Sequence, residues 1–159
     1  MNLVRIFSVA TIIFFIDQIT KFYVVRYLQL NEKFFISVFD PFLNFQMAWN
    51  RGINFGLFGS DTEATRIILI LITFIICIML VWWFRNSHGV RSQISVGFII
   101  GGALGNAFDR ATYGAVADFL NISCCGVTNP FSFNVADIAI FFGAIGLLFS
   151  GEEQKTEIE

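Results

Sequence analysis

Four long apolar stretches are separated by more polar segments along the chain. The second stretch, residues 67–84, contains no charged residue and would be about 27 Å long as an α-helix, close to the thickness of a bilayer core. The others cover residues 3–27, 92–108 and 135–149 and carry few charges. A bilayer admits only helices and closed barrels, and these stretches are too long and too uniformly apolar for barrel strands. The pattern therefore predicts four transmembrane helices.

We expect residues 1–159 to form a single integral membrane domain. Its four helices place the connecting loops and the tail on two sides of the membrane. The loop 85–91 and the acidic tail 150–159 fall on one side, and the loops 28–66 and 109–134 fall together on the other. The distribution of lysine and arginine over all loops does not settle the orientation. The compact loop 85–91 is basic and has no acid, which favours the cytoplasm for its side. We therefore expect both longer loops to be extracytoplasmic.

The first of these longer loops has room for structure of its own. Two segments, 34–39 and 43–48, are interpreted as short strands, and they flank the turn signal Asp40-Pro41. Residues 114–122 offer a further strand. We therefore expect an all-α membrane protein that carries a small extracytoplasmic β-sheet platform and a loop over its functional site.

Composition supports a membrane protein and excludes other function classes. Hydrophobic residues make up 56% of the 159 residues and charged residues 14%, whereas soluble domains carry about 25% charge. A net charge of −2 offers no basic surface for nucleic acid. The single histidine, His88, leaves no zinc ligand set, so we expect no metal and no other cofactor. Cys124 and Cys125 are adjacent, which is poor geometry for bonding each other, and we interpret them as apolar loop residues.

Two carboxylates in polar breaks between apolar stretches are the strongest candidates for chemistry. Asp118 and Asp137 lie next to hydrocarbon, where a charge is costly and usually functional. The helix count places both at one membrane face, and Asn134 is a good helix N-cap with Asp137 three residues on. Two like charges in a dry site share a proton. One carboxylate can then take a proton from water while the other polarises a carbonyl.

Other polar residues gather at the same face, and the residues alone leave three functions open. Asp17 and Lys21 are spaced for a local ion pair, and Arg110 has the donors to steady a carboxylate or a peptide carbonyl. Besides a peptidase, the pattern fits a proton or ion translocator with Asp17, Asp118 and Asp137 as relay sites. It also fits a noncatalytic subunit whose polar residues only cap helices. A relay predicts carboxylates spread through the membrane depth, which counts against the translocator.

The third predicted helix carries glycines at a spacing of four residues. Gly97, Gly101 and Gly105 share one helix face, and Gly102 lies beside them. Small residues on one face let two helices approach closely in a membrane. We therefore predict a helix contact along this stripe and assign it no catalytic role.

Five motifs together resemble the lipoprotein signal peptidase family, also called signal peptidase II. They occur in the family's order and span nearly the whole chain. Each is weak alone, but the set is highly specific. The motifs are Asp17-Gln-Ile-Thr-Lys21, Asn50-x-Gly52-x-x-Phe-Gly56, Gly101-Gly-x-x-Gly-Asn106-x-x-Asp109-Arg110, Gly114-x-Val-x-Asp118-Phe and Phe133-Asn134-x-Ala136-Asp137.

The resemblance implies an aspartic endopeptidase of the bacterial cytoplasmic (inner) membrane, a multi-pass protein with its active site near the outer face. Its expected substrates are prolipoproteins with a diacylglyceryl-modified cysteine, cut just before that cysteine to release the signal peptide. Membrane lipids and the inhibitor globomycin are the other expected ligands. Asp118 and Asp137 become the catalytic dyad, and Asp109 becomes a structural residue. The residues expected to shape the pocket or bind substrate are Asp17, Asn50, Gly52, Asn106, Arg110 and Asn134.

The chain departs from the family pattern at two positions. Asn54 stands where the family usually has a small residue, and Ala117 stands where Val is frequent. Both changes affect how a loop packs over the pocket, and neither removes a carboxylate.

Overall fold

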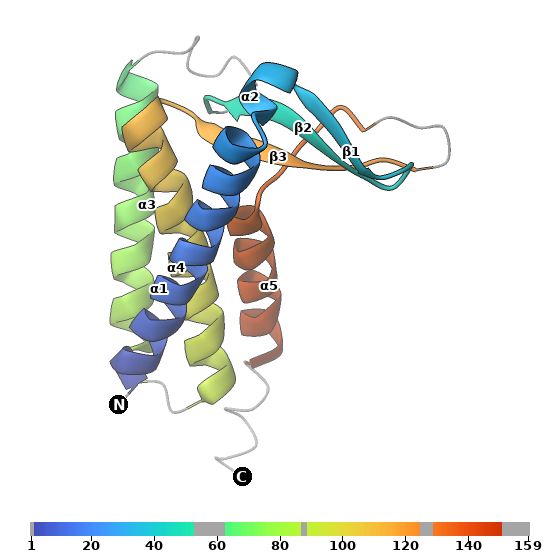
Figure 1. The fold of residues 1–159 in the computed structure, drawn as a ribbon. Coiled ribbons are helices and arrows are strands. Elements are labelled where there is room, and N and C mark those ends of the chain that lie inside the picture. The colour runs from blue at the N-terminus through green and yellow to red at the C-terminus, as the bar shows by residue number, and fades with distance from the viewer. Residues whose placement is uncertain (1, 53–62, 87–88, 125–128, 151–159) are drawn as a thin grey trace.

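The computed structural model describes residues 2–52, 63–86, 89–124 and 129–150. Four long helices stand side by side as a bundle, and a small sheet lies across one end of it (Figure 1). They are α1 (Asn2–Lys21), α3 (Glu63–Phe84), α4 (Val90–Tyr113) and α5 (Val135–Ser150). Some expectations concern residues outside these ranges. They are His88, Cys125, the tail from residue 151 and the loop over the site that includes Asn54.

The exposed surfaces of the helices are those of a membrane protein. By length and apolar composition, two segments of the described ranges are able to cross a membrane, Leu3–Tyr27 and Glu63–Phe84, and α5 is apolar but shorter. Along α3, large side chains such as Phe74 and Trp83 are exposed. Apolar side chains on the outside of a helix are stable in lipid and unfavourable in water. The mostly helical, apolar architecture agrees with the sequence, while the count of four crossings stays a prediction.

Helix α4 is the central element, because it packs against α1, α3 and α5. Its glycines make the close contacts possible. A Cβ atom built on Gly101 would lie 2.5 Å from the carbonyl oxygen of Ala10 on α1, and one built on Gly102 would lie 2.5 Å from that of Ala136 on α5. The predicted stripe therefore faces α1, and Gly102 gives α5 a second close approach.

Helix α3 is held less firmly than its neighbours. Its only buried side chain is Cys77, which packs with Ile6, Val96 and Ile100 in the core of the bundle. The half of α3 nearer the sheet has no buried residue. An apolar cavity of about 500 Å³ lies beside it, lined by residues of α1, α3 and α4 that include Phe14, Phe74 and Phe108.

The three strands form an antiparallel sheet in the order β1-β2-β3. The strands are β1 (Phe35–Phe39), β2 (Leu43–Asn50) and β3 (Val116–Ile122), close to the segments predicted from sequence. Helix α1 reaches the sheet through a π-helical segment, Phe22–Tyr27, and the short helix α2 (Leu30–Lys33). Beneath the sheet, Phe119 packs with Val24 and Leu30 in a second core.

Two local features differ from the sequence interpretation. Helix α4 continues past the apolar stretch to Tyr113 and ends at Gly114, whose φ of +79° suits a residue without a side chain. Asp109 and Arg110 therefore lie on its last turns, not in a loop. Cys124 is disulfide-bonded, which corrects its interpretation as an apolar loop residue.

Candidate active site

Asp118 is placed by the alternation of side chains along β3. Ala117 and Phe119 point to the face that packs against the segment after α1, so Asp118 points to the opposite face. Its side chain is 4% exposed. One carboxylate oxygen, Oδ2, accepts a hydrogen bond from Asn50 Nδ2 at 3.1 Å, and Oδ1 accepts one from Asn134 Nδ2 at 2.6 Å.

Asp137 lies in the first turn of α5 and forms a reciprocal cap with Asn134. The backbone N–H of Asp137 donates to Asn134 Oδ1 at 2.9 Å, and the backbone N–H of Asn134 donates to Asp137 Oδ2 at 3.1 Å. Two unpaired donors at the helix start are satisfied in this way. The other oxygen, Asp137 Oδ1, accepts a hydrogen bond from Asn106 Nδ2 at 2.9 Å. Both oxygens of Asp137 are thus held in place.

Asn134 connects the two carboxylates. It is fully buried, its side-chain nitrogen donates to Asp118 Oδ1, and its backbone N–H donates to Asp137 Oδ2. The pKa of Asp118 is raised to about 6, mainly by burial and also by the neighbouring charge of Asp137. The hydrogen bonds from Asn50 and Asn134 act in the opposite direction. Asp118 is therefore able to gain and lose a proton close to neutral pH.

The pKa of Asp118 leads to a stability prediction. A carboxyl whose pKa rises from 3.8 to about 6 on folding stabilises the fold below pH 4 and loses that contribution as the pH passes 6. The loss is at most about 3 kcal/mol. We expect Asp118→Asn to have a higher Tm than the wild type at pH 8, and a smaller advantage at pH 5, in detergent melting curves. An equal difference at both pH values would contradict the buried-charge explanation.

Asn50 is oriented by the turn that follows β2. Its Oδ1 accepts the backbone N–H of Gly52 at 3.1 Å, which leaves Nδ2 to face Asp118. The φ of Gly52 is +135°, a conformation that residues with side chains rarely adopt. The pair Asn50-x-Gly52 therefore presents one amide donor to the carboxylate.

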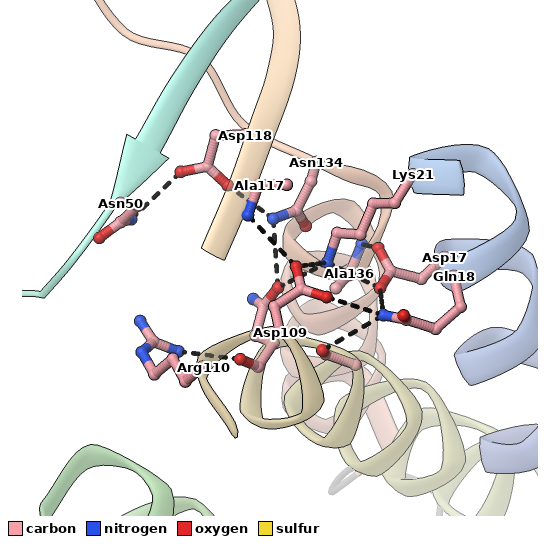
Figure 2. A network of polar contacts seen from close by, with 12 residues as sticks. Asp17, Gln18, Lys21, Asn50, Asp109, Arg110, Ala117, Asp118, Asn134 and Ala136 are labelled. Carbon is pink, nitrogen blue, oxygen red and sulfur yellow. Dashed lines mark hydrogen bonds and ion pairs between the residues drawn. The ribbon is translucent and has the colours of Figure 1, made fainter. Parts of the chain in front are cut away.

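Arg110 brings an unused donor to the same place. Its Nη1 makes only a long contact of 3.5 Å to the backbone oxygen of Asn106, and its Nε is buried without a hydrogen-bond partner. It lies close enough to Asp118 and Asp137 to interact with both charges. Figure 2 shows Arg110, Asn50 and Asp118 on the side of Asn134 away from Lys21. A guanidinium with a free donor suits a bound carbonyl.

Behind the carboxylates lies a buried ion network (Figure 2). Lys21 Nζ is 2.8 Å from Asp17 Oδ2 and 2.7 Å from Asp109 Oδ2. Gln18 Nε2 donates to both carboxylates, at 3.1 Å and 3.0 Å. The sequence predicted the pair Asp17–Lys21 from its spacing. It missed Asp109 as a partner, because the spacing along one helix does not indicate contacts with another helix. It also missed Gln18.

The predicted site residues thus form one hydrogen-bonded group at the sheet end of the bundle. Among the described residues, no cluster of three or more His, Cys, Asp or Glu side chains is arranged to hold a metal ion. The group instead contains the linked carboxylates of Asp118 and Asp137, the carboxylate of Asp17, three asparagine amides, one arginine and Gly52. Paired carboxylates with amide donors are suited to acid–base chemistry on a polar bond.

A family model described as Signal peptidase (SPase) II matches residues 9–151. The chain belongs to the signal peptidase II family. A lipoprotein signal peptidase from Rhodopseudomonas palustris is 36% identical over 137 residues, which cover 84% of this chain and 83% of that protein. One from Nitrobacter hamburgensis is 37% identical over 136 residues, covering 84% and 82%. A solved structure described as a bacterial membrane enzyme has a TM-score of 0.76 and 26% identity, and covers 96% of this chain and 90% of its own.

Membership in the signal peptidase II family makes the chain an enzyme, a peptidase of the hydrolase class. Removal of signal peptides from prolipoproteins is the reaction of this family. The resemblance drawn from the five motifs is confirmed. The role of each site residue stays a matter of proposal, and the geometry above is its support.

Proposed function

We propose that the chain is an aspartic endopeptidase that cuts diacylglyceryl-modified prolipoproteins just before the modified cysteine, with Asp118 and Asp137 as the catalytic pair. The observation that carries the proposal is the bridge through Asn134, whose side-chain amide donates to the carboxylate of Asp118 and whose backbone N–H donates to the carboxylate of Asp137. A bridge of this kind holds two like charges together, although they repel each other. Such an arrangement favours one shared proton over the pair.

The hydrolysis mechanism needs one carboxylate of the pair ionised and the other protonated. A water molecule between them gives a proton to the ionised carboxylate as its oxygen attacks the scissile carbonyl carbon. The protonated carboxyl gives its proton to the carbonyl oxygen, and a tetrahedral diol forms. When the C–N bond breaks, a proton passes to the leaving amine and the shared proton is restored. The structure supports this role for the pair without dividing the two tasks between Asp118 and Asp137.

The remaining site residues are proposed to bind the peptide around this pair. Arg110, with its unpartnered Nε, is placed to receive a backbone carbonyl of the substrate. Asn50 and Gly52 lie at the exposed rim, at the end of β2. Asn106 holds Asp137 in the orientation that chemistry needs.

We further propose one multi-pass domain of four crossings in the bacterial cytoplasmic membrane, with the site near the outer face. Helix α1 begins and α5 ends at the end of the bundle away from the sheet, as four crossings require (Figure 1). The described carboxylates of the site gather at the sheet end, which argues against a relay through the membrane. A substrate anchored by acyl chains would present its scissile bond near that interface.

The proposed function is tested by cleavage with the purified full-length protein in detergent or lipid. It should cut a diacylglyceryl-modified prolipoprotein and cut the unmodified precursor at least about tenfold more slowly, because the acyl chains contribute binding energy. Equal rates would contradict the lipid requirement. No cleavage of either substrate by folded protein would contradict the function.

Two additions to the same assay separate the mechanism from its alternatives. Globomycin is expected to block turnover, since it is an inhibitor of the family. EDTA is expected to leave the rate unchanged, because no step uses a metal. Inactivation by EDTA that added zinc reverses would overturn the two-carboxylate mechanism.

A further inference from the structure

Lys21 is a buried charge near the site whose ammonium group is surrounded by acceptors. Its side chain is 5% exposed, and its ammonium group has three N–H donors. Nζ donates hydrogen bonds to Asp17 Oδ2 at 2.8 Å and to Asn106 Oδ1 at 3.2 Å, and it forms an ion pair with Asp109 Oδ2 at 2.7 Å. One side chain of α1 therefore ties together two positions of α4 and one of its own helix.

Each of the two carboxylates also accepts a backbone N–H, and the two N–H groups belong to special positions. Asp17 Oδ1 accepts from Ala136 at 3.0 Å, and Asp109 Oδ2 accepts from Ala117 at 3.2 Å. Ala136 directly precedes Asp137 in the chain, and Ala117 directly precedes Asp118. Figure 2 shows both contacts converging on the network around Lys21. The backbone before each member of the pair is thus bound to a carboxylate that Lys21 holds.

Lys21 reaches Asp137 by a second route, through the amide of Asn106. Because the ammonium only donates, it must face the oxygen of that amide, and Asn134 Nδ2 donates to the same oxygen at 3.1 Å. The nitrogen of Asn106 is then left to donate to Asp137 Oδ1. Without Lys21, the oxygen of the Asn106 amide would lose one of its two hydrogen-bond donors, and this orientation would be less stable.

From these contacts we propose that Lys21 is a positioning residue for the reaction. Through Asp17 and Asp109 it sets the distance between the backbone segments that carry Asp137 and Asp118, and through Asn106 it orients Asp137. The inference rests on the proposed function, because it assigns Lys21 to the catalytic pair named there. The contacts of Lys21 are to Asp17, Asn106 and Asp109, so it acts on Asp118 and Asp137 through other residues.

Stability alone gives a poor account of this network. A buried ion pair is often replaced by apolar residues of similar size with little loss of stability, since desolvating the charges offsets their attraction. The fold here keeps three buried ionisable groups, Asp17 and Asp109 at 0% exposure and Lys21 at 5%. If apolar residues replaced Asp17 and Asp109, the backbone N–H groups of Ala136 and Ala117 would have no acceptor.

The charge of Lys21 gives the proposal a readout that a structural role would not move. Lys21 lowers the pKa of Asp118, whereas burial and Asp137 raise it. The other charges near Asp118 are Arg110 and Asp109 on α4, while Arg66 of α3 pairs with Glu63. Removing the Lys21 charge should therefore move the acid limb of the pH–rate profile to higher pH.

The test compares Lys21→Met with Lys33→Met in the full-length protein, using the diacylglyceryl-modified prolipoprotein. Lys33 is an exposed residue of α2 that bonds only the Leu28 oxygen, so it is a matched control. We expect Lys21→Met to lower kcat about 10- to 100-fold with KM changed less than about threefold, as loss of positioning predicts. Its acid limb should move to higher pH. A folded Lys21→Met with the kcat and pH profile of Lys33→Met would overturn the proposal, whatever its Tm.

A second variant covers the case in which Lys21→Met fails to fold because it leaves two carboxylates without a cation. Lys21→Met with Asp109→Asn removes one of those charges, which relieves the unpaired buried charge. We expect this double variant to fold and to remain at least tenfold slower than wild type. Wild-type kcat in the double variant would overturn the proposal. Inactivity of the wild type in the same assay would instead overturn the proposed function.

Discussion

Replacing Asp137 with asparagine is expected to abolish cleavage of a diacylglyceryl-modified prolipoprotein, with a fall in kcat of ~1,000-fold or more. Asparagine cannot take a proton from water or share one with Asp118. Its side-chain oxygen is still able to accept the backbone N–H of Asn134, so the start of α5 should stay capped. The measurement is single-turnover cleavage by purified protein, with a melting curve in detergent to show that the variant is folded.

Asp118→Asn should have the same effect on the rate, because the proposed mechanism uses one proton on two carboxylates. Asp40→Asn makes the same chemical change at an exposed position before β2 and should leave the rate unchanged. Retention of more than about one-tenth of the activity in a folded variant of either site would overturn the assignment of the pair.

Gly102→Ala is expected to damage both folding and catalysis. The added Cβ would lie 2.5 Å from the carbonyl oxygen of Ala136 and 3.0 Å from Ile140 Cγ1. A backbone oxygen moves only with its helix, so α5 must shift away from α4. We expect a loss of about 1–3 kcal/mol in the free energy of unfolding, as for other overpacked cores. Because Asp137 follows Ala136, cleavage should fall at least about tenfold in the protein that still folds.

The control for this variant adds bulk to the same helix where there is room. Ala111→Val enlarges an exposed position of α4, and we expect its Tm and its cleavage rate to match the wild type. If folded Gly102→Ala has wild-type activity, the close approach of α4 and α5 does not set the position of Asp137. Thermal melts and cleavage rates on the same preparations make the comparison.

The sequence predicted most of the secondary structure because hydropathy and turn signals are local. The apolar stretches marked the four long helices, and Asp40-Pro41 separated β1 from β2. The predicted span 92–108 follows the apolar side chains, whereas the helix α4 continues to Tyr113. What ends the helix is Gly114, a backbone signal that hydropathy does not contain.

The site was predictable in its residue types and not in its contacts. Asp17 and Lys21 face each other by helical spacing alone. That Lys21 also meets Asp109 depends on how α1 lies against α4, and Gly101 and Gly105 fix that packing. The direction of each asparagine amide likewise follows from partners on other elements, such as Asp118 for Asn50. Contacts of this kind come from the assembled fold.

The weak attachment of α3 has a consequence for how a substrate arrives. A peptide anchored by acyl chains diffuses in the plane of the bilayer, and moving those chains into water would be unfavourable. Helix α3 is held in the core through Cys77, and its half beside the sheet buries no side chain. That half packs through partly buried side chains alone, so an outward movement would cost less there than at Cys77. A sideways entrance between helices, opened from the lipid, would let the scissile bond reach Asp118 while the acyl chains remain in hydrocarbon.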